Sequence, residues 1–95
     1  MSVAFAPEAV EDLAAAVEYL RERNPRAAAA TADAVFAAVD RLAAHEFEGP
    51  ESELRTTGER VRSWPVRPYR IYYRRDGENL IVLRIYHSAR RPISR

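Results

Sequence analysis

Apolar residues alternate with polar ones near the start of the chain, and they then recur with a helical period. Residues 2–6 alternate, with Val3 and Phe5 on one side, and this pattern predicts an opening strand. Pro7 follows, with acidic residues in the next turn, which is typical of a helix start. We expect one apolar stripe on this helix, with spacings of three and four residues. It contains Val10, Leu13, Val17 and Leu20.

The Asn24-Pro25 pair predicts the end of this helix and the start of a second one. Asparagine caps helix N-termini well, and proline suits the first helical position. The second stripe runs through an alanine-rich tract and contains Ala28, Ala32, Val35, Phe36, Val39, Leu42 and Ala43. Because so short a turn joins the two helices, we expect them to pack as an antiparallel hairpin.

The period changes to alternation after residues 46–57, a polar segment that predicts a loop. Arg60–Val66 and residues 69–75 are predicted strands, and Asp76-Gly77 indicates a hairpin turn. A last strand is expected at Asn79–His87. Its predicted core residues are Ile81, Leu83 and Ile85. The order β-α-α-β-β-β predicts an α+β fold, with the helical hairpin packed on one face of a small, mainly antiparallel sheet.

The length and composition exclude several classes of protein. The 95 residues allow one domain, residues 1–95, of which 88–95 form a basic tail. No cysteine is present, which excludes disulfides, thiolate metal sites and a cysteine nucleophile. With two histidines, His45 and His87, we expect no metal site and no cofactor. The sequence has neither a long apolar run nor an export signal, so we expect a cytoplasmic protein without a membrane partner.

The net charge of +1 conceals a strong separation of charge along the chain. Residues 1–54 carry four arginines and eleven acidic residues, whereas residues 55–95 carry eleven arginines and three acidic residues. Lysine is absent, and a GC-rich genome would account for that preference. Codon usage does not account for the sorting of acids and arginines into opposite halves. The separation therefore predicts an anionic partner for the second half.

Several of these arginines share one face of the predicted sheet with tyrosines. We call Arg70, Tyr72, Arg74, Arg84 and Tyr86 the arginine–tyrosine face. If residues 76–78 form a three-residue turn, Arg70 lies directly opposite Arg84, and the two repel unless water or an anion lies between them. Arginine forks suit phosphates and carboxylates, and tyrosines stack on bases or fill pockets of a partner. A merely hydrated face is the alternative, and the charge separation favours a partner-binding face. Trp64 is expected to anchor the core or a sheet edge.

The order of elements and three short segments resemble a known superfamily. They are Glu-Asp-Leu at residues 11–13, Tyr-Arg-Ile-Tyr-Tyr at 69–73 and Arg-Ile-Tyr-His-Ser-Ala-Arg at 84–90. Together they resemble the RelE/ParE superfamily, the toxins of bacterial type II toxin–antitoxin systems. The resemblance implies a cognate antitoxin, encoded by the adjacent gene, with a DNA-binding N-terminal domain. We expect its C-terminal segment to dock on the helical hairpin, add to the sheet edge and cover the arginine–tyrosine face.

The resemblance implies one of two activities. RelE-type toxins cut messenger RNA on the ribosome, whereas ParE-type toxins poison DNA gyrase. Two lysines of RelE-like ribonucleases match Val61 and Ser63, so both are missing, although Arg70 and Arg90 match two arginines that lie near the scissile phosphate. A ribonuclease would then rely on His87 for proton transfer beside Arg70 and Arg90. A histidine at a strand end is more often structural.

The segment at residues 84–90 is more similar to ParE-type toxins, so the favoured prediction is a gyrase-directed toxin that is not an enzyme. The residues expected to bind the target or the antitoxin are Arg70, Tyr72, Arg74, Arg84, Tyr86, Arg90 and Arg91. A ribosome-dependent endoribonuclease of the RelE type is the first alternative. A non-catalytic nucleic-acid-binding module is the second.

Overall fold

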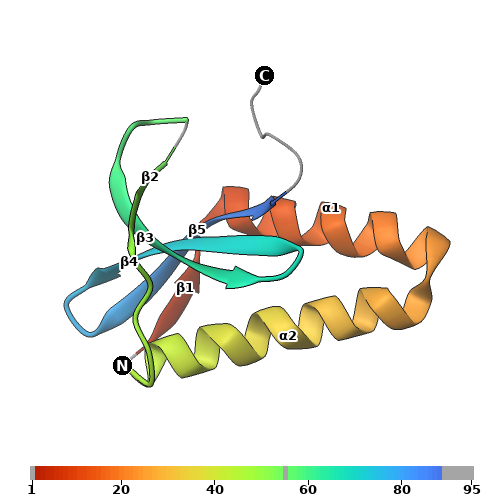
Figure 1. The fold of residues 1–95 in the computed structure, drawn as a ribbon, viewed down its shortest axis with the longest axis horizontal. Helices are drawn as coiled ribbons and strands as arrows, with labels where there is room; N and C mark the ends of the chain where they lie inside the picture. The colour runs from red at the N-terminus through yellow and green to blue at the C-terminus, as the bar shows by residue number, and fades with distance from the viewer. Residues whose placement is uncertain (1, 55, 89–95) are drawn as a thin grey trace.

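A helical hairpin covers one face of a five-stranded sheet in the computed structural model, which describes residues 2–54 and 56–88 (Figure 1). The elements are β1 (Val3–Phe5), α1 (Pro7–Arg23), α2 (Pro25–Ala43), β2 (Glu51–Glu53), β3 (Arg60–Val66), β4 (Tyr69–Asp76) and β5 (Asn79–His87). The strand order is β1-β5-β4-β3-β2. All neighbours are antiparallel except β1 and β5, which are parallel. The predicted α+β fold is confirmed, and β2 is an additional short strand within the predicted loop.

Asn24 ends one helix and begins the next. Its backbone N–H donates to the carbonyl oxygen of Leu20 at 2.6 Å, and its side-chain oxygen accepts a hydrogen bond from the N–H of Ala27 at 3.2 Å. Pro25 occupies the first helical position, where no backbone donor is needed. The predicted cap and the tight antiparallel hairpin are therefore confirmed (Figure 1).

The core combines alanines with larger aliphatic residues where the helices approach the sheet. Val35, Val39 and Leu42 of α2 are buried against β4 and β5, and α1 contributes the fully buried Ala9. Two residues of the predicted stripes are instead exposed: Val10 to 53% and Phe36 to 48%. Ala9 and Val35, the residues directly before Val10 and Phe36, lie on the inward side of their helices, so the helical period turns Val10 and Phe36 away from the core.

The prediction that Ile81 and Leu83 of β5 face the helix-side core is wrong. The buried residues of β5 on the helix side are Leu80, Val82 and Ile85. The register jumps from Tyr73–Val82 to Tyr72–Arg84, so Leu83 has no direct partner and forms a β-bulge. Because residues 80–83 are all apolar, simple alternation does not reveal which of them face the core.

The turn between β4 and β5 has two residues and not the three expected. Asp76 pairs with Asn79, and Gly77 has a φ of 64°, as a type II′ turn requires at its first central position. This turn and the bulge together change the cross-strand pairs. Arg70 faces Tyr86, and the predicted Arg70–Arg84 pair is wrong.

The segment between α2 and β2 is held against the sheet by polar and aromatic contacts. The N–H of Gly49 donates to the Tyr73 hydroxyl at 2.8 Å, and Arg62 Nη1 donates to the Gly49 carbonyl at 2.8 Å. Phe47 stacks on Trp64, with ring centroids 4.0 Å apart. Trp64 thus packs against the core, as expected, and the whole segment docks on β3 and β4.

Candidate functional site: the arginine–tyrosine face

The five residues of the arginine–tyrosine face lie on the side of the sheet that is turned away from the helices. Tyr72 and Tyr86 belong to a second apolar cluster, separate from the helix-side core, with Leu54, Val61 and Leu83. Register places the remaining members on the same side. The predicted grouping therefore holds in the structure. Two further candidates from the sequence, Arg90 and Arg91, lie outside the described residues.

This face is more closed than the sequence indicates. Leu54, from the connection between β2 and β3, is buried over it, and Tyr86 is only 8% exposed. The rings of Tyr72 and Tyr86 lie 5.3 Å apart in a tilted arrangement. An open, hydrated face is therefore the wrong description of this part of the sheet, because its tyrosines are packed side chains.

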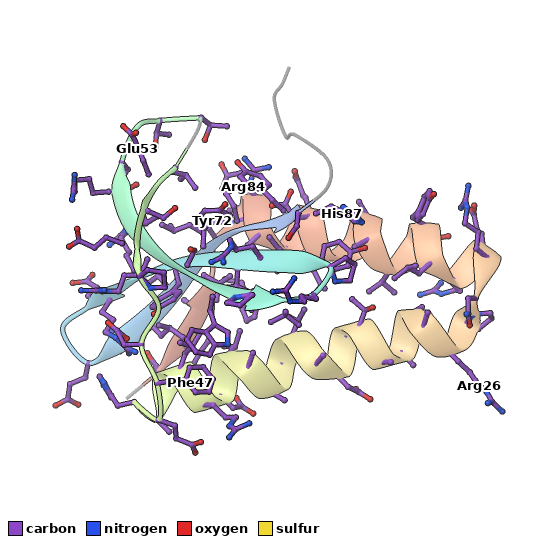
Figure 2. The ribbon with its side chains drawn as sticks, in the orientation of Figure 1. Arg26, Phe47, Glu53, Tyr72, Arg84 and His87 are labelled. Carbon is purple, nitrogen blue, oxygen red and sulfur yellow. The ribbon has the colours of Figure 1, made fainter. Side chains whose placement is uncertain are left out.

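Arg84 has an internal counterion. Its Nε and Nη2 donate to the two carboxylate oxygens of Asp12 at 2.8 and 3.0 Å, and the Ile85 N–H donates to the same carboxylate at 2.9 Å. β1 pairs with β5 only from Leu80 to Val82, and Asp12 of α1 bonds the edge of β5 just beyond that point. Figure 2 shows the Arg84 side chain near the start of α1. The hydrogen bonds to Asp12 raise the pKa of Arg84. Its positive charge is thus compensated within the chain.

Arg70 and Arg74 are held less firmly. Arg70 Nη1 donates to the buried Ser63 hydroxyl at 2.8 Å, and no carboxylate among residues 2–54 and 56–88 pairs with it. Arg74 Nε lies 3.5 Å from Glu59, with both side chains partly exposed. Arg70 is therefore the arginine of this face whose charge is not balanced by a described acidic residue.

His87 lies on the opposite face from Arg70. It pairs across the strands with Tyr69, whose ring belongs to the helix-side core and meets the imidazole edge-to-face at 5.2 Å. Both residues line a groove beside Leu20 of α1 and Pro68. The structure therefore does not bring His87 beside the Arg70 guanidinium, and Arg90, the third residue of the predicted ribonuclease set, is outside the described residues.

The sequence did not reveal the acidic partners of the arginines. Glu48 binds Arg62 at 3.0 Å and Arg75 at 2.6 Å. Other first-half acids pair in the same way, as in Asp12–Arg84 and Glu51–Arg60. The charge separation is thus used in part within the chain, which corrects the inference that it requires an external partner.

In the described residues, no helix is long and apolar enough to cross a membrane. The same part of the chain holds no group of three or more histidine, cysteine or acidic side chains placed to bind a metal ion. The arginine–tyrosine face presents the guanidinium groups of Arg70 and Arg74, whereas the Tyr86 hydroxyl is buried.

Removing the Tyr86 hydroxyl is expected to raise the stability of the fold. This hydroxyl is buried without a hydrogen-bond partner in the described structure, and such a group costs about 1–3 kcal/mol. We therefore expect Tyr86→Phe to increase the free energy of unfolding by about 1 kcal/mol in urea titrations. Tyr73→Phe is the matched control, because its hydroxyl bonds Gly49 and Glu48. A loss of stability in both variants would contradict the prediction.

Glu48 should make the stability depend on pH in the acid range. Its pKa is lowered from 4.5, chiefly by the hydrogen bond from Arg75 and also by the nearby Arg62 charge and the Tyr73 hydroxyl. A carboxyl whose pKa is lower in the folded state stabilises the fold above its unfolded pKa and loses that contribution as pH falls through the folded pKa. We expect the urea midpoint of the wild type to fall more steeply below pH 4.5 than that of Glu48→Gln. Parallel pH profiles would refute this.

The comparisons with known proteins agree with this architecture. A family model described as the ParE toxin of the type II toxin–antitoxin system, parDE, matches residues 3–92. Among solved structures, a chain of the chromosomal ParDE toxin–antitoxin system from P. aeruginosa is 25% identical, with a TM-score of 0.72. That match covers 92% of this chain and 95% of the other. No curated protein sequence matches.

A helical hairpin on one face of a small mixed sheet is the RelE/ParE-like fold, and the structural match shows it over nearly the full length. The fold is shared by RelE-type and ParE-type toxins, and the family model that matches this chain is the ParE model. Because the model covers residues 3–92, the chain belongs to the ParE toxin family of type II toxin–antitoxin systems. The resemblance seen in the sequence is thereby confirmed.

Proposed function

We propose that this ParE-family chain arrests growth by acting on DNA gyrase and that a cognate antitoxin neutralises it. The observation that carries the proposal is the match of the ParE model to residues 3–92. A further argument is that Val61 and Ser63 occupy the two positions that hold lysines in RelE-like ribonucleases. Val61 is buried in the second apolar cluster, and buried Ser63 bonds Arg70, so neither position presents a cation.

The separation of His87 from Arg70 is a second argument against a ribonuclease. Attack by a 2′-hydroxyl needs a proton carrier and a phosphate clamp at the same atoms. Here the imidazole faces the helix side and Arg70 faces the other side of the sheet. Arginine stays protonated and is a poor general base, so Arg70 alone supplies binding and not proton transfer.

Arg70 is the residue that we propose contacts the target. Its guanidinium uses one nitrogen on Ser63 and has no described carboxylate partner, so its fork can meet a carboxylate or phosphate of the target. A charge-assisted hydrogen bond is worth about 1.5–3 kcal/mol, which corresponds to roughly tenfold or more in affinity. The exposed Arg74 on the same strand adds positive charge nearby.

A supercoiling assay with purified gyrase tests the gyrase target. We expect the protein to inhibit supercoiling of relaxed plasmid, Arg70→Gln to need roughly tenfold more protein for the same inhibition, and His87→Ala to be unchanged. Arg26→Gln, on the exposed start of α2, is the matched control (Figure 2). Primer extension on translated messenger RNA gives the opposing outcome. If the messenger RNA is cut, the cuts disappear in His87→Ala and supercoiling is unaffected, the gyrase proposal is wrong and the endoribonuclease alternative is supported.

For the antitoxin we propose an acidic, amphipathic C-terminal segment that follows a DNA-binding N-terminal domain. The exposed apolar side chains Val10 and Phe36 on the helical hairpin suit the apolar side of such a segment. The outer edge of β1, at one side of the sheet, can accept an added strand.

Calorimetry with the product of the adjacent gene tests this surface. We expect Val10→Ala with Phe36→Ala to weaken binding by roughly tenfold or more, since each truncation removes apolar contact area. Ala34→Ser, at another exposed position of α2, is the control. Equal affinities for all three proteins would remove the helical hairpin from the interface.

A further inference from the structure

A pocket rich in arginine opens where β3 and β4 separate. The two strands pair from Val66–Tyr69 to Arg62–Tyr73, and beyond that point each strand pairs only with its other neighbour. The resulting pocket has a volume of about 260 Å³. We call it the arginine pocket, and its lining residues are Arg60, Arg62, Arg74, Arg75, Glu48, Glu51 and Val61.

The two inner arginines are fixed in place. Glu48 accepts hydrogen bonds from Arg75 and lies 3.0 Å from Arg62 Nε. Each guanidinium also donates to a backbone carbonyl, Arg75 to Leu42 and Arg62 to Gly49, both at 2.8 Å. The hydrogen bond to Glu48 raises the pKa of Arg75. This network fixes two guanidinium groups and one carboxylate in the wall of the pocket, so it carries one net positive charge that needs no further reorganisation.

The two outer arginines have partners that an anion can replace. Arg60 pairs with Glu51 at 2.7 Å, but their side chains are 79% and 60% exposed. Arg74 lies 3.5 Å from Glu59, also near the surface. Exposed pairs of this kind contribute only about 0–1 kcal/mol, so exchanging the glutamate for another anion costs little.

We propose that the arginine pocket binds a phosphate group, which Arg60 and Arg74 contact beside the fixed guanidinium groups of Arg62 and Arg75. Four guanidinium groups line the pocket against two carboxylates, and the guanidinium fork matches phosphate oxygens in pairs. The inference goes beyond the proposed function, because gyrase inhibition through Arg70 does not require it. The phosphate belongs either to a nucleic-acid backbone or to a free phosphorylated molecule.

The first arm of the test uses fluorescein-labelled duplex DNA and the whole protein. Fluorescence anisotropy at several salt concentrations gives the slope of log affinity against log salt, to which each phosphate contact adds about 0.9. Because Arg60 and Arg74 contact the same phosphate, we expect Arg60→Gln with Arg74→Gln to reduce this slope by about one. Arg21→Gln with Arg26→Gln removes the same charge from exposed helix positions and is expected to leave the slope unchanged.

The second arm uses inorganic pyrophosphate in calorimetric titrations of the same proteins. A reduced slope of log DNA affinity against log salt concentration in the Arg60/Arg74 variant identifies a nucleic-acid backbone as the source of the bound phosphate. Loss of pyrophosphate binding alone identifies a free phosphorylated ligand. If neither probe distinguishes the Arg60/Arg74 variant from the helix control, the proposal is overturned.

The single variant Arg60→Gln, at a highly exposed side chain, repeats both arms without disturbing the fold. Supercoiling inhibition is measured in parallel on all variants. Arg60→Gln leaves both Arg70 and Arg74 of the arginine–tyrosine face intact, so with this variant failure of the pocket proposal leaves the gyrase proposal standing, and the reverse also holds.

Discussion

Gly49→Ala is expected to lower the free energy of unfolding by about 3 kcal/mol, the upper part of the range for overpacking. A Cβ atom on Gly49 would lie 1.8 Å from the carbonyl oxygen of Ser63 and 2.8 Å from its carbon. Both are backbone atoms of β3, so they cannot rotate away as a side chain can. The segment from α2 to β2 would have to leave the sheet, and the bonds of Gly49 to Tyr73 and Arg62 would break.

Urea unfolding followed by circular dichroism measures this loss. Gly77→Ala is the matched control, because Gly77 has a φ of 64° but no atom within 4 Å of the added Cβ. It should cost about 1–2 kcal/mol, the penalty for alanine in a left-handed conformation. If Gly49→Ala proved no more costly than Gly77→Ala, the close approach to Ser63 would not be a constraint on this fold.

Asp12→Ala should be the second severe change, with a loss of about 3 kcal/mol. The carboxylate accepts two hydrogen bonds from Arg84 and one from the Ile85 N–H, and the Asp12 side chain is only 16% exposed. Its removal leaves a partly buried cation and a backbone donor without partners. Glu11→Ala, at the adjacent exposed position of the same helix, should change stability by less than about 0.5 kcal/mol.

A double variant separates the charge from the packing. Asp12→Ala combined with Arg84→Met removes the stranded cation, so it should recover part of the stability lost in Asp12→Ala alone. No recovery in thermal or urea unfolding would mean that the Ile85 N–H, and not the ion pair, accounts for the loss. An Arg84 substitution in a binding assay therefore reports the stability of the fold as well as any contact with a partner.

Local patterns predicted the regular elements of the fold well. The bounds of β3 and β5 agree with the expected strands, and Asn24-Pro25 marks the helix junction. The short strand β2 escaped because Glu51–Glu53 has no apolar alternation. It forms because the edge of β3 offers backbone hydrogen-bond partners, which a sequence does not display.

The candidate site was predictable in composition but not in its environment. Alternation correctly placed Arg70, Tyr72 and Tyr86 on one face. The surroundings of that face depend on tertiary contacts. Leu54 covers it, and Asp12 binds Arg84, which lies 72 positions later in the sequence. Neither contact has a local pattern, so the face was expected to be open and its arginines uncompensated.

The separation of charge was the most informative and the most easily misread feature of the sequence. Acidic residues of the first half, including Glu48, Glu51 and Asp12, pair with arginines of the second half when the chain folds. Among the described residues, Arg70 has no carboxylate partner, and the arginine pocket holds four guanidinium groups beside two carboxylates. On the part of the surface that the structure describes, a partner therefore meets defined guanidinium groups at these two places, where the composition indicated a broadly basic half.

The stacking of Phe47 on Trp64 provides a built-in optical reporter. Trp64 is the single tryptophan of the chain, so its fluorescence arises from one environment, where β3 meets the segment that precedes β2. Detachment of that segment would expose the indole to water and shift its emission to longer wavelength. The same signal needs no label, so it can follow the docking of Phe47 in real time while an antitoxin or a phosphate-bearing ligand is added.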